Sequence, residues 1–549
     1  MEELAHVKFK FSKETNLGEC IRVVGSHDSL GSWDPEKSIK LLTDPDTYPY
    51  WATSVLQVPL NTVIYYKYLY IKGETVIWES LPNRKLCLTQ KRVVIIDTDK
   101  SYISKVFYSD FDFSKPEELF DETCSLSDSD SILILTMALP VAVSKGLNGE
   151  FEFEQTKGVW QSQLYSVLSK RKNEFLWFGL SSYKPDSEEE KERLIKTMKE
   201  QFRCVPVFIE DSLLEEHEKF CSLVLYKLLH NIIDLSIEAT ECSFKLWTSY
   251  KRFNILFSEQ MLHYYNGQMI WVHGAQFFLV PSFMSRRTKE IMNIGFFLHH
   301  PFPSSEILRM FPYREAILHA LCCCDLIGFH LFPYARNFLS CCKRVLGLSV
   351  EPTRGGYFGL NYYGRHIMVR SEHIGIQPEI IETISSSPEF LSYSHELISK
   401  YHPNRIILSI DAAHELAGIS MKFKAFEQAY PKMKSKAIFI QVLVPQQTLV
   451  ENAKIKDQVC QLADLINSRN NQQLIEIVQK NLTNEERYAY MKISHALLIN
   501  CIKDGLCLQP FEYLVIKREK CRIALSEFAG VSTAVNSPKK INPFNVLSN

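Results

Sequence analysis

The chain has 549 residues, a formal net charge of −1, 46% hydrophobic and 23% charged residues. This composition excludes a mainly disordered protein, and the length predicts three or four domains, each with its own core. The balanced charge argues against a protein that binds nucleic acid or membrane surfaces through bulk electrostatics, and no run of 18 apolar residues predicts a membrane span.

The N-terminal residues and the cysteines predict a cytoplasmic protein with reduced thiols. The start, MEELAHVKFKF, lacks the basic and apolar regions of a secretory signal. The 15 cysteines include the consecutive Cys322, Cys323 and Cys324 and show no pair of zinc-type knuckles. This spacing favours small buried packing positions, so we expect no disulfide framework and no metal site.

Residues 1–100 predict an antiparallel β-sandwich. Short β-branched or aromatic runs, among them VKFKF, CIRVVGS, VIYYKYLYI and KRVVIID, alternate with Gly, Pro, Asn and Asp turns. Residues 101–130 follow as a predicted acidic linker, because the stretch SDFDFSKPEELFDETCSLSDSDS is rich in acids and contains one lysine.

From residue 131 onwards the pattern predicts an α/β fold. Compact apolar runs such as SILILT, MIWVHG and IMNIGFFLH alternate with amphipathic stretches, and the alternation restarts at NRIILSID. Such alternation indicates parallel sheets covered by helices on both faces. We therefore expect two Rossmann-like halves, residues 131–400 and 401–549, with a ligand cleft between them.

The motifs VVGSHDSLGSWD, YPYWATSVLQVP, YYKY and VIWESLPNR resemble the starch-binding modules of carbohydrate-binding family 20. The resemblance implies α-glucan binding, in which flat aromatic rings bind the apolar face of a sugar and polar groups bind its hydroxyl rim. It implies a principal site made of Trp33, Trp78, Lys67, Glu79 and Asn83. Trp51 is expected in the core, and the family's second site is expected to be weaker because its tyrosine is Leu17 here.

The segment IGFFLHHPFPSSEILRMFPYREAILHALCCCDLIGFH, with DGLCLQPFEYLV and SEFAGVS, resembles trehalose phosphate synthases of glycosyltransferase family 20, especially the plant-type second class. The resemblance implies a GT-B fold, and active members transfer glucose from UDP-glucose to glucose 6-phosphate with retention. His299 and Asp504 match the family's donor-sugar positions and are the candidate catalytic remnants; Gly505 and Glu512 also match. A structural role is favoured for Glu512 and stays open for His299.

Other positions of the family's site have lost their chemistry. In the loop SIDAAHELAGIS, the arginine and lysine that neutralise the departing diphosphate align with Ala412 and Ala417. A phosphate-cradling glycine pair is not recognisable around Lys145, Gly146 and Leu147. Further family positions for arginine, aspartate, arginine and glutamate align with Ala138, Gly274, Gln447 and Ala534.

These losses predict a catalytically impaired protein of trehalose metabolism, because one missing charge-stabilising group already lowers a rate by about 10²–10³. The expected partners are starch or glycogen, weakly bound sugar phosphate or UDP-glucose, and an active trehalose phosphate synthase. No cofactor, nucleic acid or membrane is expected, and the location is cytoplasmic, at starch or glycogen granules.

Two alternatives stay open from the sequence. An active synthase would need replacement cations, and Lys422, Lys424 and Arg405 are near in sequence, although the helix after Gly418 should carry its lysines onto the outer surface. A pure scaffold would bind no small molecule in the cleft. The chain ends at Asn549, where the family continues with closing helices and, in the second class, a phosphatase domain, so a truncated C-terminal half is expected.

Overall fold

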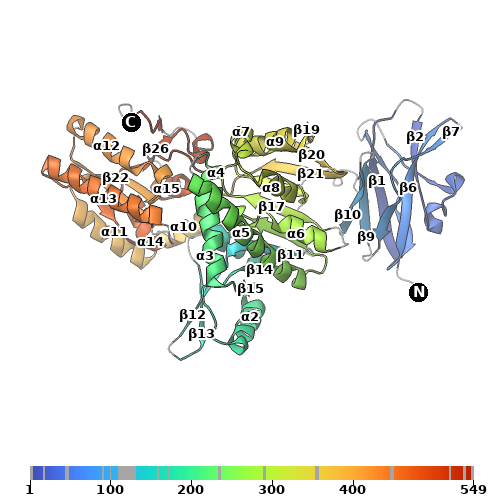
Figure 1. The fold of residues 1–549 in the computed structure, drawn as a ribbon, viewed down its shortest axis with the longest axis horizontal. Helices are drawn as coiled ribbons and strands as arrows, with labels where there is room; N and C mark the ends of the chain where they lie inside the picture. The colour runs from blue at the N-terminus through green and yellow to red at the C-terminus, as the bar shows by residue number, and fades with distance from the viewer. Residues whose placement is uncertain are drawn as a thin grey trace. The chain divides into compact units, whose positions relative to one another are not determined.

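The computed structural model describes residues 4–545 apart from 16–18, 44–47, 74, 89–91, 99–100, 109–130, 147, 157–159, 171–173, 233–236, 289–291, 353–357, 434, 445–449, 519–520 and 536–538. The chain forms two compact units (Figure 1). Unit 1 contains Met1–Ser131, Lys172–Glu174 and Leu348–Met368, and unit 2 contains Ile132–Arg171, Phe175–Gly347 and Val369–Asn549.

The first hundred residues of unit 1 form the predicted sandwich of two sheets. One sheet has the order β10-β9-β1-β4 with β5 also paired to β1, and the other has the order β3-β2-β6-β7 with β8 also paired to β6. The described pairings are antiparallel except for β1 with β9, which is parallel. The strands are β1 (Leu4–Ser12), β2 (Glu19–Gly25), β3 (Ile39–Lys40), β4 (Tyr50–Ala52), β5 (Leu56–Pro59), β6 (Val63–Lys72), β7 (Thr75–Trp78), β8 (Arg84–Cys87), β9 (Arg92–Thr98) and β10 (Ser101–Tyr108).

Alternation along the strands fills the core of this sandwich. Tyr66 and Tyr68 of β6 are fully buried, and their rings lie 4.9 Å from Phe9 and 3.9 Å from Phe11. Tyr65, before this pair, and Lys67, between its members, face the outer side of the sheet, as the period of two requires. The core is therefore built mainly from aromatic rings.

The N-terminal boundary predicted for the linker, residue 101, is too early. Residues 101–108, expected to be linker, form strand β10, whose register with β9 includes Lys105 opposite Ile96. The β-branched and aromatic residues of SYISKVFY favour a strand in spite of the acidic residues that follow. Pairing with β9 also satisfies the backbone hydrogen-bonding groups of this segment. The rest of the predicted linker, residues 109–130, lies outside the described residues.

Two sheets built around parallel strands form the Rossmann-like halves that the sequence predicted. The first has nine strands in the order β15-β14-β11-β16-β17-β18-β21-β20-β19. Its parallel part is formed by β15 (Cys204–Val207), β14 (Phe175–Leu180), β11 (Ile132–Ala138), β16 (Met269–His273), β17 (Ile294–Leu298) and β18 (Leu326–Phe329). The sheet continues with β21 (Arg365–Ser371), β20 (Phe358–Tyr362) and β19 (Val350–Pro352), of which β20 and β19 are antiparallel. The second has the order β24-β23-β22-β25-β26-β27, formed by β24 (Ile475–Val478), β23 (Ala437–Val444), β22 (Arg405–Ala412), β25 (Ala496–Ile499), β26 (Ile523–Ser526) and β27 (Lys539–Ile541).

Helices connect the parallel strands of unit 2. In the first half they include α1 (Trp160–Lys170), α2 (Glu188–Phe202), α3 (Asp211–Lys219), α4 (Lys227–Leu229), α5 (Ile237–Tyr264), α6 (Val280–Arg287), α7 (Ser305–Arg309), α8 (Arg314–Leu321) and α9 (Phe332–Leu346). In the second half they include α10 (Pro378–Ile384), α11 (Pro388–Tyr401), α12 (Ile419–Ala429), α13 (Val450–Asn470), α14 (Asn484–Ile493) and α15 (Gln509–Lys517). Short helical turns occur at η1 (Asp28–Leu30), η2 (Pro35–Lys37), η4 (Phe220–Tyr226), η5 (Ala275–Phe277), η7 (Glu415–Ala417), η8 (Tyr430–Lys432) and η10 (Gly530–Thr533).

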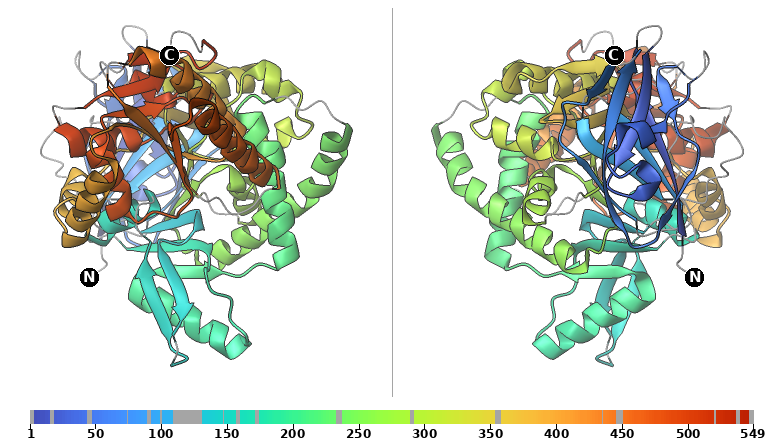
Figure 2. Two further views of the ribbon diagram at one scale, coloured as in Figure 1. Left: turned by 90° about the vertical axis from the view of Figure 1, so that its left-hand side faces the viewer. Right: turned by 90° about the vertical axis from the view of Figure 1, so that its right-hand side faces the viewer.

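Three further elements complete the described fold. The hairpin of β12 (Val141–Lys145) and β13 (Phe151–Gln155) lies beside α2, as all views show (Figure 2). A second hairpin joins β19 (Val350–Pro352) to β20 (Phe358–Tyr362), and β21 (Arg365–Ser371) follows it. None of the helices described is both long and apolar enough to cross a bilayer.

Candidate functional site

Trp33 and Trp78 form an aromatic pair on the surface of the sandwich. Trp78 is the last residue of β7 and is 41% exposed, while Trp33 is half-buried in the turn after η1. Their ring centroids lie 6.4 Å apart with an angle of 34° between the planes. The N–H of Trp33 donates to the carbonyl of Gly25, which ties this turn to the end of β2. The two indole faces can stack on neighbouring sugar rings.

The polar residues expected around this pair behave differently from one another. Lys67 is half-buried, and its Nζ donates to the carbonyl oxygen of Glu79 at 3.3 Å, whereas Asn83 is exposed. The Glu79 side chain is only 3% exposed, which contradicts its expected role as a side-chain ligand for glucan. Its carboxylate points into the sandwich, because the buried Arg84 requires an anionic partner there.

Arg84 joins two buried carboxylates inside the sandwich. Its Nη2 lies 2.9 Å from Oε2 of Glu79, and its Nη1 lies 3.4 Å from Oδ1 of Asp97. The hydroxyls of Tyr66 and Tyr68 donate to Oδ2 of Asp97 at 2.8 and 2.7 Å. This network satisfies the charges of Glu79, Arg84 and Asp97 without solvent, which the sequence motif WESLPNR did not reveal.

The two remaining expectations for the module have different outcomes. Trp51 is 7% exposed and its indole N–H donates to the carbonyl of Lys13 at 3.1 Å, so its predicted core position is confirmed. Leu17, which carried the expectation of a weak second site, lies outside the described residues.

A chain of three histidines lies at the carboxyl edge of the first sheet in unit 2. His273 ends β16, while His299 and His330 follow β17 and β18, so neighbouring parallel strands bring them together. Nδ1 of His273 lies 3.1 Å from Nε2 of His299, whose Nδ1 lies 3.2 Å from Nε2 of His330. Burial lowers the pKa of His273 to about 3 and that of His330 to about 4, so the chain is neutral near pH 7.

Trp160, the first residue of α1, packs on this histidine chain. Its ring centroid lies 4.2 Å from that of His299 and 4.8 Å from that of His273. The histidine expected to contact a donor sugar is thus stacked against an indole of its own chain. Neither Trp160 nor His330 was a sequence candidate, although the strand–histidine pattern LIGFH matches GFFLH.

A second aromatic cluster connects the two halves of unit 2. Tyr226 of η4 lies 4.0 Å from His230, 6.5 Å from His300 and 6.1 Å from His414, measured between ring centroids. His414 follows β22 and therefore comes from the second half. Burial lowers the pKa of His230 to about 3 and that of His300 to about 4, which keeps this cluster uncharged as well.

Asp504 and Gly505 lie where the two halves meet. The hydroxyl of Tyr334, on α9, donates to the carbonyls of Asp504 and Gly505 at 2.8 and 3.1 Å. A Cβ added to Gly505 would lie 2.6 Å from the carbonyl oxygen of His299, so the close approach requires glycine. Burial raises the pKa of the Asp504 carboxyl to about 6 and lowers that of Lys503 to about 8. The predicted remnants His299, Asp504 and Gly505 do come together.

Glu512 has a structural partner instead of an open site. It is 5% exposed, and its two carboxylate oxygens accept from Nη1 and Nη2 of Arg487 at 2.7 and 2.9 Å. This bidentate pair links α15 to α14, which agrees with the structural role favoured for Glu512 from the sequence.

An ion pair joins the two elements on either side of the loop for which the sequence analysis expected a diphosphate-binding role. Lys422 is 1% exposed, and its Nζ lies 2.6 Å from Oδ2 of Asp411 and 2.9 Å from Oγ of Ser409. Its expected position on the outer surface of α12 is therefore wrong: the helix turns this residue toward the sheet, where Asp411 at the end of β22 compensates its charge. Lys424 and Arg405 are exposed.

The other altered positions lie as follows. Ala412 ends β22 and is half-buried, and Ala417 is 2% exposed at the end of η7. Ala138 is exposed at the end of β11, and Ala534 is half-buried after η10. Gln447 and Leu147 lie outside the described residues, and Lys145 is paired with Glu190 at 2.8 Å.

Gly274, which stands where the family has aspartate, has a backbone conformation suited to glycine. Its φ is +93° and its ψ is 156°. A Cβ at this position would also lie 2.5 Å from Oε1 of Gln276. The loss of the carboxylate is therefore coupled to the local backbone path.

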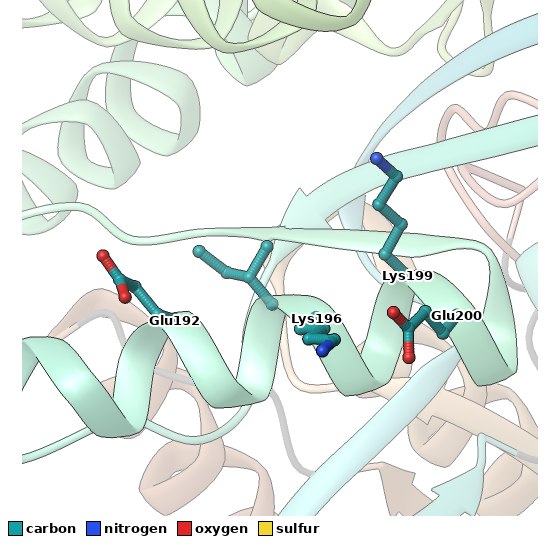
Figure 3. A pocket seen from close by; sticks show the side chains of 5 residues that line it. Glu192, Lys196, Lys199 and Glu200 are labelled. Carbon is teal, nitrogen blue, oxygen red and sulfur yellow. The ribbon is translucent and has the colours of Figure 1, made fainter.

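A hollow on the outer face of α2 has no such chemistry. Figure 3 shows its lining side chains, which belong to Glu192, Ile195, Lys196, Lys199 and Glu200 of this one helix. Acids and lysines spaced four residues apart are typical of a solvated helix face. We therefore place the candidate sites at the Trp33–Trp78 pair and at the histidine-rich region where the two halves of unit 2 meet.

Comparison with known proteins identifies the family of each part of the chain. Residues 130–548 match glycosyltransferase family 20, and residues 4–96 match the starch binding domain. The chain belongs to glycosyltransferase family 20. It also has a starch-binding domain at its N-terminal side, as the sequence motifs predicted.

Similar proteins are named as trehalose-phosphate synthases. "Probable alpha,alpha-trehalose-phosphate synthase (UDP-forming) 7" of Arabidopsis thaliana is 30% identical over 461 residues, covering 80% of this chain and 54% of that protein. "Alpha,alpha-trehalose-phosphate synthase (UDP-forming) 2" of Aspergillus fumigatus is 32% identical over 430 residues, covering 75% of this chain and 87% of that protein. The chain thus spans about half the length of the plant relative.

Solved structures show the same fold for unit 2. The N-terminal domain of Candida albicans trehalose-6-phosphate phosphatase is 26% identical, with a TM-score of 0.64, covering 76% of this chain and 88% of that one. A Burkholderia xenovorans trehalose-phosphate synthase in complex with glucose-6-phosphate is 20% identical, with a TM-score of 0.63 and coverages of 76% and 90%. This likeness confirms the predicted GT-B arrangement.

Proposed function

We propose that this protein binds starch or glycogen through its N-terminal domain and that its synthase-like cleft has lost ordinary glucosyl transfer. The cleft then serves as a sugar-phosphate sensor, or as a scaffold that binds an active trehalose phosphate synthase at a glucan granule in the cytoplasm. UDP-glucose binding is weak in this proposal.

The glucan-binding part rests on the exposed tryptophan pair. Trp33 and Trp78 have tilted rings whose centroids lie 6.4 Å apart, and Nζ of Lys67 donates to the carbonyl of Glu79, the residue after Trp78. Asn83 is exposed a few residues further along the chain. Flat rings with a few polar groups are what an uncharged sugar chain needs for binding.

The loss of transfer rests on the ion pair of Lys422 with Asp411. A departing diphosphate needs cations that have no other partner, and the loop places neutral side chains at Ala412 and Ala417. The Lys422 ammonium already contacts Asp411 at 2.6 Å and Ser409 at 2.9 Å, so its charge is neutralised inside the protein. This single observation argues most directly against the alternative of an active synthase.

The group of three histidines, His273, His299 and His330, supports the same proposal. The His299 ring packs against Trp160 with 4.2 Å between the ring centroids, and its two ring nitrogens lie within hydrogen-bond distance of His273 and His330. Lys503 has no carboxylate within ion-pair distance among the described residues and is the cation we expect to attract a sugar phosphate. One half-buried lysine with a lowered pKa is weaker than the family's arginine–lysine pair.

Calorimetric titration and a turnover assay test the proposal. Maltoheptaose should bind with measurable heat, UDP-glucose should bind weakly, and UDP release in the presence of glucose 6-phosphate should stay at background. Formation of trehalose phosphate by the wild-type chain would overturn the impaired-enzyme proposal. A rise in melting temperature with glucose 6-phosphate would favour the sensor over the scaffold, because a ligand that binds only the native state stabilises it.

A further inference from the structure

The outer face of β6 carries a row of side chains that runs from the position opposite Trp78 to the end of the strand near Gly25, to which the turn with Trp33 is tied. Leu69 lies directly opposite Trp78 and is fully buried, so it forms the floor of the pair. Two residues earlier on the same face is Lys67, and two residues before that is Tyr65. Because successive same-face side chains are about 7 Å apart along a strand, Tyr65 lies roughly 14 Å from the Leu69 position.

Tyr65 presents its ring to solvent, unlike its neighbours in the core. It is 43% exposed, whereas Tyr66 and Tyr68 are fully buried. Both backbone polar groups of Tyr65 bond to Ser26: its N–H donates to Oγ of this serine, and its carbonyl accepts from the serine N–H. The Tyr65 hydroxyl has no hydrogen-bond partner within the part of the chain that the structure describes. The backbone that carries this exposed ring is therefore fixed.

A second row of side chains lines the same face from β7 and β8. Trp78 pairs with Leu69 near one end, and Lys85 of β8 pairs with Tyr65 near the other. Asn83 lies in the short connection between these strands and is exposed, as Lys85 is. The face therefore continues from the indole pair through a lysine and an asparagine to a tyrosine beside a lysine.

This order of groups suits a long uncharged polysaccharide. Aromatic rings at both ends can bind apolar sugar faces, while ammonium and amide groups between them donate to or accept from hydroxyls. The row is continuous with the glucan site proposed above and lies on one strand, so a single chain can contact all of it.

We propose that the glucan surface extends from the Trp33–Trp78 pair along β6 to Tyr65, and that Tyr65 with Lys85 forms a further subsite for an α-1,4-linked glucan chain. The inference rests on the proposed glucan binding. It gives the domain a preference for long chains over short ones, because a long chain can contact Tyr65 in addition to both indoles.

Titration of the full-length protein with maltotriose and maltoheptaose tests this extension. Tyr65→Ala should weaken maltoheptaose binding about fivefold to tenfold, the range of one lost aromatic contact, and leave maltotriose binding unchanged. Tyr65→Phe, which keeps the ring, should retain wild-type affinity for both. Val76→Ala is the matched control, since Val76 lies on the opposite side of Trp78 along the same face and is 40% exposed.

The outcomes separate the extension from the proposed function. If Trp78→Ala abolishes binding but Tyr65→Ala changes neither affinity, the subsite is wrong and the glucan site stands. Equal weakening of both sugars by Tyr65→Ala, or a loss with Val76→Ala instead, also overturns the subsite. If the wild-type chain binds neither sugar, glucan binding itself fails. The melting temperature of each variant should match that of wild type. If Tyr65→Ala is less stable, Tyr65→Phe decides instead: wild-type affinity in this variant supports the role of the ring, and weakened maltoheptaose binding contradicts it.

Discussion

The ammonium of Lys422 on α12 lies 2.6 Å from the carboxylate of Asp411 at the end of β22, so the pair bridges the loop between these two elements. Oδ2 of this carboxylate also accepts from Ser409 and from Nε2 of Gln441, at 2.8 and 2.9 Å. The charge is therefore used to hold β22, α12 and β23 together. This arrangement makes the loop a structural element of the second half.

Removing one partner of this pair should destabilise the second half. Lys422→Met leaves Asp411 without its cation, and a broken pair at this depth costs about 3 kcal/mol of unfolding free energy. The double variant Asp411→Asn with Lys422→Met should recover part of that loss, because no charge then lacks a partner. Urea unfolding of both variants measures the difference, and equal stability of the single variant and wild type would contradict the structural role.

The two indoles should carry most of the glucan affinity. Trp33→Ala and Trp78→Ala should each abolish most retention on starch, because each removes one of two stacking faces. Ile77→Ala is a suitable control, since Ile77 is 51% exposed but adjacent residues of a strand face opposite sides. Affinity electrophoresis in amylopectin measures retention; unchanged migration of both tryptophan variants would place the glucan site on another surface.

Arg84 should matter for folding of the sandwich. Arg84→Met leaves the buried carboxylates of Glu79 and Asp97 without their cation, and we expect a loss of about 3–5 kcal/mol. Lys85→Met changes an exposed neighbour and serves as the control. Chemical denaturation followed by tryptophan fluorescence compares the two, and a stable Arg84→Met protein with weakened glucan binding would restore Glu79 as a ligand.

Restoring the family's aspartate at residue 274 should not restore activity. Gly274→Asp places a side chain at φ +93° and should lower stability by about 1–3 kcal/mol. Gly274→Ala separates the backbone effect from the charge, and both variants should lose similar amounts of stability. Thermal unfolding together with the UDP-release assay measures this; transfer activity in Gly274→Asp would show that the missing carboxylate alone had stopped catalysis.

Acid should lower the unfolding free energy of unit 2, because His273 and His330 are buried and neutral in the folded protein. The pKa of His273 falls to about 3 and that of His330 to about 4, against about 6.5 in an unfolded chain. Between these values the unfolded chain binds more protons, so the contribution is complete above about pH 6.5 and is lost as the pH falls toward 3. The urea midpoint at pH 7 and pH 5 should differ less in His273→Gln/His330→Gln than in wild type; an equal difference would contradict this.

The sequence by itself determined the fold classes and the aromatic chemistry. Strand alternation and helical periodicity, together with the family motifs, gave the sandwich, the two parallel sheets and the Trp33–Trp78 pair, because these features depend on local residue patterns. The family resemblance, and not local periodicity, indicated His299 and Asp504, whose segments the structure brings close together where the two halves of unit 2 meet.

Only the tertiary structure decided which charged side chains face solvent. Glu79 reads as a ligand beside Trp78, yet it pairs with Arg84 in the core, and Lys422 reads as a surface residue, yet it pairs with Asp411. Burial and pairing of a charge depend on groups distant in the chain, so no local pattern reveals them. For the same reason, the contact between Trp160, the first residue of α1, and His299 is visible only in the packing of unit 2.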